Sequence, residues 1–219
     1  NFSSLHPSSL IPHPFLSLLT PYSFSSQPQF LLDKLDAPVQ RYVPEFAGPG
    51  KDRVTVRHLF THSSGLPAGR ELFRQAPTHD SALALVFATP LDTLPGVRET
   101  YSDLGAILAG VVVERVSGLR LSSLASREVF HPLGMRDTRY LPPESWLPRI
   151  APTENDPWRG HVLRGEVHDE NAARLDGITG HAGLFGSAAD LVRYGEWWLQ
   201  AGTRAGGRAG SDSVGPPCP

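Results

Sequence analysis

Apolar residues recur at helical spacing in five parts of the chain, and each part carries start or stop signals of a helix. The strongest run extends from Ser102 to Ser117, and Gly118 follows it where a C-terminal stop is expected. Because apolar residues occupy almost its whole circumference, we expect this helix to be buried on most sides. The other predicted helices span 56–60 after Thr55, 81–87 after a cap at Asp80, 121–130, and 188–199 after Ser187 with Asp190 in a capping box.

Strand patterns are weak in comparison. Short alternating runs occur at 97–100, 138–141 and 161–167, and none of them is long enough to define a clear strand. The sequence also shows no internal repeat. These patterns predict a helical layer joined by loops, with little sheet of its own.

Composition changes abruptly near both ends of the chain. Residues 1–30 are rich in Ser and Pro, hold no charged residue, and have prolines that interrupt their apolar runs. We expect this segment to be disordered or loosely attached. A Gly/Arg/Ala stretch followed by a Pro-rich stretch forms a tail over 203–219, which leaves the length of one domain at 31–202.

Charge and cysteine content exclude several classes of function. The net charge is −2, and the basic residues, 18 of 20 being arginine, are scattered, so we expect no nucleic-acid-binding stripe. The single Cys218 excludes an intramolecular disulfide and a multi-cysteine zinc site. No apolar run reaches the roughly 18 residues of a transmembrane segment. The first residues do not resemble a signal peptide, so the localisation stays open.

Common catalytic motifs are absent: the sequence has no phosphate-binding loop, no Gly-x-Ser-x-Gly and no His-Glu-x-x-His. His58 and His62 have the spacing of a metal pair, but they lack a nearby carboxylate, so packing at a helix end is favoured. The segment 168–171 offers oxygen ligands for a cation, and a hydrogen-bonded loop is favoured there. Glycines at every third position of 177–186 indicate turns before the last helix.

The triplet Tyr101-Ser102-Asp103 stands at the start of the most buried helix, and two interpretations of it stay open. In the first, Tyr101 acts as a general base in a cleft, provided that a nearby cation favours its deprotonated form. In the second, Ser102 or Asp103 caps the helix and Tyr101 packs as a hydrophobic staple. The second is favoured when the triplet is taken alone.

Several recognisable sequence motifs follow one another along the chain. They lie at 35–46, 54–67, 101–105, 130–138, and at 167–172 with 180–185; the fourth ends in Pro-Leu-Gly-Met-Arg-Asp-Thr. Together, over about residues 32–199, they resemble the serine beta-lactamase and penicillin-binding-protein-like hydrolase family, of its class C and esterase-like branch. The resemblance implies an α/β fold of the beta-lactamase/transpeptidase kind, with a helical region inserted between sheet-forming N- and C-terminal segments.

The resemblance also implies a catalytic machinery of which the sequence holds only a part. The family uses a serine and a lysine in Ser-x-x-Lys, a Tyr-x-Asn second motif, and a Lys/His-x-Gly strand beside the oxyanion hole. Ser-x-x-Lys is absent, because Leu31 stands three residues before Lys34 and Gly48 stands three residues before Lys51. We therefore predict a fragment of the family that lacks the nucleophile motif.

Tyr101 and Asp103 occupy the second-motif positions and are the candidate catalytic residues implied by the resemblance. Asp103 departs from the family's asparagine: an amide donates a hydrogen bond to a carbonyl, whereas an ionised carboxylate does not and repels anionic substrates. His181-Ala182-Gly183 has the letters of the third motif. It directly precedes the last helix instead of following it, so we expect it to be unrelated.

The expected fold is mainly the helical part of the α/β family fold, with the sheet-forming ends missing or replaced. Its helices would then expose an apolar face, which predicts marginal stability or association. The implied activity is hydrolysis of an amide or ester bond in a small-molecule or peptide-like acyl substrate through an acyl-enzyme, with no metal or organic cofactor.

Without Ser-x-x-Lys, we expect this chain to be inactive. The alternative is a non-catalytic relative that keeps the cleft as a binding module. A third hypothesis, compatible with the first, is that both ends were translated out of frame. Relatives of this kind usually work in the periplasm or outside the cell, but nothing in the sequence assigns a compartment.

Overall fold

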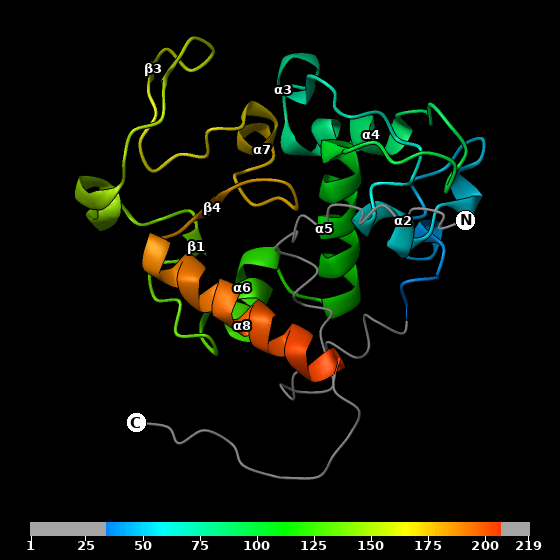
Figure 1. The fold of residues 1–219 in the computed structure, drawn as a ribbon. Helices are drawn as coiled ribbons and strands as arrows, with labels where there is room; N and C mark the ends of the chain where they lie inside the picture. The colour runs from blue at the N-terminus through cyan, green and yellow to red at the C-terminus, as the bar shows by residue number, and fades with distance from the viewer. Residues whose placement is uncertain (1–33, 207–219) are drawn as a thin grey trace, which may run out of the picture.

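One long buried helix, α5 (Asp103–Ser117), runs through the middle of the computed structural model, which describes residues 34–206 (Figure 1). Nine of its 15 residues are buried. The Ser102 hydroxyl caps its N-terminus by accepting a hydrogen bond from the Gly105 N–H, and Gly118 ends it in the left-handed conformation (φ 69°). The predicted bounds of this helix and its burial on most sides are confirmed.

Three short helices and two 3₁₀ turns form an apolar core with α5. The helices are α2 (Val56–Phe60), α3 (Leu72–Gln75) and α4 (His79–Ala88), and the turns are η2 (Val39–Arg41) and η3 (Lys51–Arg53). Each contributes a buried side chain, and all except η3 add an apolar one to the same cluster. This core fixes α5 against the first third of the described residues.

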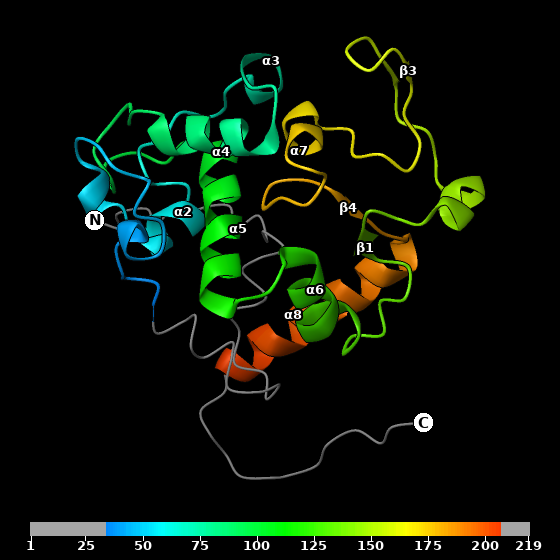
Figure 2. The ribbon, with the colours of Figure 1, turned by 180° about the vertical axis from the view of Figure 1, so that it is seen from behind.

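A second apolar cluster lies on the other side of α5. It is built from α6 (Leu121–Ala125), which continues as a π turn, η4 (Ser126–Phe130), and from α8 (Ala188–Gly206), whose Tyr194 packs against the cluster. Figures 1 and 2 both show α8 crossing beside α6. The helix predicted over 121–130 is confirmed as α6 together with η4.

The paired strands within residues 34–206 are four strands of two residues each. β1 (Arg139–Tyr140) pairs antiparallel with β4 (Leu184–Phe185), and β2 (Asn155–Asp156) pairs antiparallel with β3 (His161–Val162). The β2–β3 hairpin projects to one side in Figure 2, and the Trp158 ring in its turn packs against Phe73 of α3 at 5.2 Å between ring centres. η5 (Glu144–Arg149) lies between β1 and β2 in the chain. The runs at 138–141 and 161–167 thus become strands over only two residues.

The strand predicted at 97–100 is wrong. This segment follows Gly96, which has a left-handed conformation (φ 80°), and it pairs with no strand in the described residues. Its Thr100 N–H donates to the His62 carbonyl oxygen at 2.8 Å, and the Thr100 hydroxyl accepts from Arg98. Local turns and a tertiary contact therefore use the groups that a strand ladder would need.

The start of α4 also differs from its prediction. Thr78, not Asp80, is the cap, because its hydroxyl accepts the Ser81 N–H while the Ser81 hydroxyl accepts the Thr78 N–H. Asp80 lies in the first turn, where its charge favours the helix dipole. At α8, the Asp190 N–H donates to the Ser187 hydroxyl as predicted, but the Asp190 carboxylate accepts hydrogen bonds from the turn before β1.

The sequence predicts a domain over 31–202. In the structure, α8 continues four residues further, to Gly206. The prediction of disorder for 1–30, and the rest of the predicted tail, lie outside the described residues. No helix within 34–206 combines the length and apolar character needed to cross a membrane.

The loop after α7 (Glu170–Arg174) approaches the backbone of α5 very closely. A Cβ placed on Gly180 would stand 1.9 Å from the Ala106 carbonyl oxygen and 3.2 Å from the Gly110 nitrogen. Only a residue without a side chain fits there, so Gly180 is a contact point and not merely one of the turn glycines. Gly177 (φ 73°) and Gly183 (φ 115°) do have the backbone of turns, as predicted.

We expect Gly180→Ala to lower the free energy of unfolding by about 3 kcal/mol, because the added methyl forces the loop away from α5. Gly195→Ala is the matched control: it lies in α8, and nothing stands within 4 Å of the added Cβ. We expect the free energy of unfolding of the control to rise by about 0.5–1 kcal/mol, because alanine favours a helix more than glycine does. Urea unfolding followed by tryptophan fluorescence measures both, and equal stability of the two variants would contradict the close approach.

An apolar groove of about 330 Å³ opens between the second cluster and α8. Its lining side chains come from α6, η4, the turn before β1, β1, β4 and α8, and include Phe130, Met135, Tyr140, Leu184 and Leu191. On α8, Leu191 is 62% exposed and Leu199 is 73% exposed. α8 therefore carries exposed apolar side chains, and the exposed face expected for a missing sheet stays a prediction.

Association of the chain through this face stays a prediction. We expect sedimentation velocity to show species that grow with protein concentration, and Leu191→Glu to shift the distribution toward the monomer because a carboxylate resists burial. Glu196→Gln on the same helix is the control. A monomer at every concentration, with a reversible cooperative thermal transition, is the result that would refute the prediction.

Candidate functional site

The candidate catalytic positions Tyr101 and Asp103 flank a buried serine at the N-terminus of α5. The Ser102 hydroxyl donates to the Pro67 carbonyl oxygen at 2.6 Å and accepts from the Gly105 N–H at 3.1 Å. Ser102 is therefore the helix cap, as one interpretation of the triplet predicts. Tyr101 is 58% exposed, so the prediction of a packed staple is wrong: its ring lies at the surface.

His62, just after α2, holds this triplet in place. Its backbone is left-handed (φ 53°), and its ring centre lies 4.6 Å from that of Tyr101. The Nδ1 atom accepts the Ser102 N–H at 3.1 Å, which requires an unprotonated Nδ1. Burial lowers the pKa of His62, although Glu99 and Asp103 oppose this. We refer to His62, Tyr101, Ser102 and Asp103 as the second-motif site.

His58 and His62 each accept a hydrogen bond from a backbone N–H through Nδ1. The Nδ1 of His58 accepts the Thr55 N–H at 3.2 Å and completes the capping box of α2. This is the helix-end packing that the sequence favoured. The bond from His62 to Ser102 was missed, because it joins residues 40 positions apart that only the tertiary fold brings together.

Asp103 lies in a mixed electrostatic environment. Burial raises the pKa of its carboxyl, His181 lowers it, Asp169 raises it and His62 lowers it, with the balance above the ordinary value. Its backbone N–H donates to the carbonyl oxygen of Ala68 at 2.8 Å. A protonated carboxyl donates a hydrogen bond as an amide does, whereas an ionised one only accepts. Whether Asp103 donates or only accepts a hydrogen bond therefore depends on the charged groups around it.

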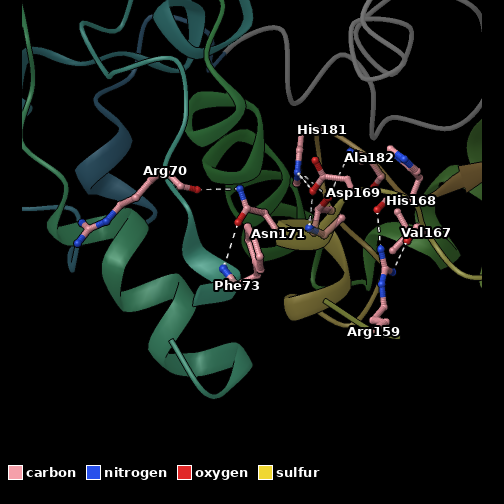
Figure 3. A network of polar contacts seen from close by, with 11 residues as sticks. Arg70, Phe73, Arg159, Val167, His168, Asp169, Asn171, His181 and Ala182 are labelled. Carbon is pink, nitrogen blue, oxygen red and sulfur yellow. Dashed lines mark hydrogen bonds and ion pairs between the residues drawn. The ribbon is translucent and has the colours of Figure 1, made fainter. Parts of the chain in front are cut away.

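The loop 168–171 is hydrogen-bonded to its surroundings, as its favoured interpretation predicts (Figure 3). Asp169 caps α7 by accepting the backbone N–H three residues further on, at 2.7 Å. The Asn171 side chain reaches the segment around α3, where it donates to the Arg70 carbonyl oxygen at 2.8 Å and accepts the Phe73 N–H at 3.2 Å. The loop thus joins α7 to α3.

His181 connects this loop to the turn before β4. Its side chain is only 3% exposed; its Nε2 lies 2.9 Å from an Asp169 carboxylate oxygen, and its Nδ1 lies 2.8 Å from the Thr179 hydroxyl oxygen. Burial raises the pKa of Asp169, but hydrogen bonds from His181 and from α7 outweigh it, and the net pKa is lowered. That 181–183 is unrelated to the family's third motif stays a prediction.

A cavity of about 560 Å³ is bordered by this network, the turn before β4 and β4 itself. Its polar lining residues are Thr153, Glu166, His168, Asp169, Thr179 and His181. The sequence did not point to this cavity, because its walls come from four separate stretches between 140 and 186.

Three carboxylates near the β2–β3 hairpin also come together: those of Glu154, Asp156 and Glu170 have oxygens within 4.8 Å of one another. Asp156 already binds Arg159, and Glu154 pairs with His168 at 2.9 Å. Because two of the three carboxylates have protein partners, we assign no metal to this group.

We expect acidification to destabilise the fold through His62. Its folded pKa lies below the unfolded value, so the unfolded state binds more protons, and stability is lost as the pH falls from about 6.5. Asn suits a left-handed backbone, so His62→Asn should flatten the dependence on pH. Urea unfolding at several pH values between 7.5 and 5 measures the difference.

His161→Asn is the control of opposite sign. A hydrogen bond with Glu166 raises the pKa of His161, so its contribution is present at low pH and is lost as the pH rises through the folded pKa. If His62→Asn and the parent chain lose stability in parallel on acidification, the bond to Ser102 does not carry the effect.

Comparisons with known proteins identify the family of the chain. The family model for beta-lactamase matches residues 32–214. The chain is 32% identical over 181 residues to an N-acetylmuramyl-L-alanine amidase of Bacillus subtilis, covering 70% of this chain and 41% of the relative. It is 31% identical over 184 residues to a "Putative D-alanyl-D-alanine carboxypeptidase" of Escherichia coli K12, covering 72% and 42%. The chain thus spans about two fifths of the length of these two relatives.

Solved structures show the same fold. A class C beta-lactamase superposes with a TM-score of 0.63 at 22% identity, over 79% of this chain and 46% of that chain. A beta-lactamase/D-alanine carboxypeptidase from Pseudomonas syringae superposes with a TM-score of 0.58 at 23% identity, over 74% and 43%. The predicted α/β fold is therefore confirmed, and the described residues are mainly helical with few strands.

Proposed function

The chain belongs to the beta-lactamase family, and we propose that its described part forms the second-motif half of a serine hydrolase site for amide or ester bonds. The observation that carries the proposal is the placement of Tyr101 and Asp103 at the N-terminus of α5, beside His62. The Tyr101 side chain is exposed and can exchange a proton with a bound substrate. The buried helix beneath it keeps this position rigid.

The proposed substrate is a small-molecule or peptide-like acyl compound, with no nucleic-acid partner. The names of the two relatives, an amidase and a D-alanyl-D-alanine carboxypeptidase, support amide bonds in short peptide-like chains. Tyr101 and Asp103 are the catalytic positions that we propose for this chain.

Catalysis by an acyl-enzyme also needs an activated nucleophile. The 219 residues contain no Ser-x-x-Lys, because neither Lys34 nor Lys51 has a serine three residues before it. Lys51 is buried and donates to the Phe87 carbonyl oxygen at 2.6 Å, far from the role of a catalytic base. We therefore propose that this chain forms no acyl-enzyme.

The alternative function is that of a binding module, and one observation favours it. Asp103 replaces the amide of the family's second motif, a change that a chain without the nucleophile motif can accept because catalysis no longer requires that amide. A module of this kind would hold an acyl substrate reversibly at the second-motif site.

The test is covalent labelling with a fluorophosphonate and with a fluorescent penicillin, read by intact mass spectrometry. We expect no adduct on this chain, while an active class C beta-lactamase treated in parallel is labelled. An adduct at a single serine would refute the inactivity.

Equilibrium binding of the same penicillin, measured by fluorescence polarisation, then separates the two functions. Reversible binding that Tyr101→Phe weakens favours the binding module. Phenylalanine keeps the exposed ring beside His62 and removes only the hydroxyl, so a loss reports the polar contact and not a change of fold.

A further inference from the structure

His62 contacts three consecutive residues, with Tyr101 in the middle. Its backbone carbonyl oxygen accepts the Thr100 N–H at 2.8 Å, and its Nδ1 accepts the Ser102 N–H at 3.1 Å. Between these two bonds, the imidazole ring centre lies 4.6 Å from that of the Tyr101 ring, with an angle of 35° between the ring planes. His62 thus binds the backbone on both sides of Tyr101 and contacts the Tyr101 side chain as well.

The backbone of His62 is held in its left-handed conformation (φ 53°) by the end of α2. The His62 N–H donates to the Leu59 carbonyl oxygen at 3.3 Å. The next N–H, of Ser63, donates to the His58 carbonyl oxygen at 2.9 Å. Histidine adopts this conformation more readily than most residues, but it still costs energy and persists only where the surroundings fix it. His62 therefore joins the end of α2 firmly to residues 100–102.

The bond to Ser102 defines the protonation state of the His62 ring. A backbone N–H can only donate, so the Nδ1 atom must carry a lone pair and no hydrogen. A proton on Nδ1 would bring two donors together and break this bond. The bond between the His62 carbonyl oxygen and Thr100 does not change, because a backbone carbonyl carries no titrating proton.

Two carboxyl groups face the His62 ring from the elements beside it. Glu99 lies in the segment that leads to Tyr101, and Asp103 lies in the first turn of α5. Both favour the protonated ring, but burial of the ring disfavours it more strongly, so the pKa of His62 is lowered. The ring is therefore neutral at neutral pH, where the bond to Ser102 is intact, and gains its proton in mild acid.

We propose that His62 is a positioning residue for Tyr101: its neutral ring and its carbonyl oxygen hold residues 100–102 so that the Tyr101 hydroxyl meets a bound acyl ligand, and protonation of the ring in mild acid loosens this hold and weakens binding of the ligand. The presence of a ligand rests on the proposed function, whereas the hold on Tyr101 does not. Because the Tyr101 side chain is largely exposed, packing restrains its ring little, and the contacts of His62 determine its orientation.

The first experiment needs no ligand. In protein with ¹³C-labelled tyrosine rings and ¹⁵N-labelled amides, the Tyr101 ring signals are those that Tyr101→Phe removes. Between pH 7.5 and 5, we expect these signals and the Ser102 amide signal to shift together, with a midpoint below about 6.5. The Thr100 amide is the internal reference and should shift much less. Tyr101 ring signals that stay constant over this range would overturn the proposal.

Two variants assign the transition to its source. Asparagine tolerates a left-handed backbone, and its amide oxygen accepts a hydrogen bond without gaining a proton, so His62→Asn should abolish the transition of the Tyr101 signals. His58→Gln is the matched control, because glutamine at this position of α2 keeps the capping box, and the transition should remain. An unchanged transition in His62→Asn would assign it to Glu99 or Asp103 and overturn the proposal.

The second experiment measures binding of the fluorescent penicillin by polarisation at pH 7.5 and pH 5. We expect the dissociation constant of the parent chain to rise about fivefold at the lower pH, as loss of one hydrogen bond implies. His62→Asn should bind equally well at both pH values, and His58→Gln should follow the parent. Equal affinity of the parent at both pH values would overturn the effect on the ligand.

The outcomes separate this proposal from the proposed function. A parent chain that binds no penicillin at either pH refutes the binding module and the effect on the ligand, and the ligand-free titration still decides whether His62 holds Tyr101. If His62→Asn fails to fold by circular dichroism, the parent titration decides: a shared transition of Tyr101 and Ser102 with a steady Thr100 amide supports the proposal, and separate midpoints overturn it.

Discussion

Packing around α5 on almost every side is the constraint on which the rest of the described structure depends. Glycine and alanine at 105, 106 and 110 keep the helix surface low, so other backbone segments come close to it. Gly180 therefore lies directly against the Ala106 carbonyl oxygen. Close contact between two backbones leaves little room for adjustment, and the loops that contact α5 are therefore fixed relative to its N-terminus.

The buried start of α5 creates a second requirement, that its polar groups find partners. The Ser102 hydroxyl and N–H are satisfied by Pro67, Gly105 and His62, which come from separate parts of the chain. This leaves Tyr101 and Asp103, on either side of Ser102, free of a capping role. The side chains proposed for chemistry are thus positioned by a neighbour whose own role is structural.

The difference between Asp103 and the family's asparagine is electrostatic, and its effect depends on surroundings from distant parts of the chain. Burial alone would favour the neutral carboxyl, while the paired His181 favours the ionised one. The site's preference for donors or acceptors is therefore a property of α5, α7 and the turn before β4 together.

By itself the sequence determined the long helix, its glycine stop, the helix over 121–130, the hydrogen-bonded loop at 168–171 and the family, since caps, periodicity and ordered motifs are local signals. It misjudged the segment 97–100, the cap at Asp80 and the packing of Tyr101, where nearby or tertiary partners compete with local propensity. Only the tertiary structure decided that His62 binds Ser102, that Gly180 meets α5 and that His181 pairs with Asp169. These contacts join residues far apart in the chain, and their geometry depends on how the helices pack, which no local pattern encodes.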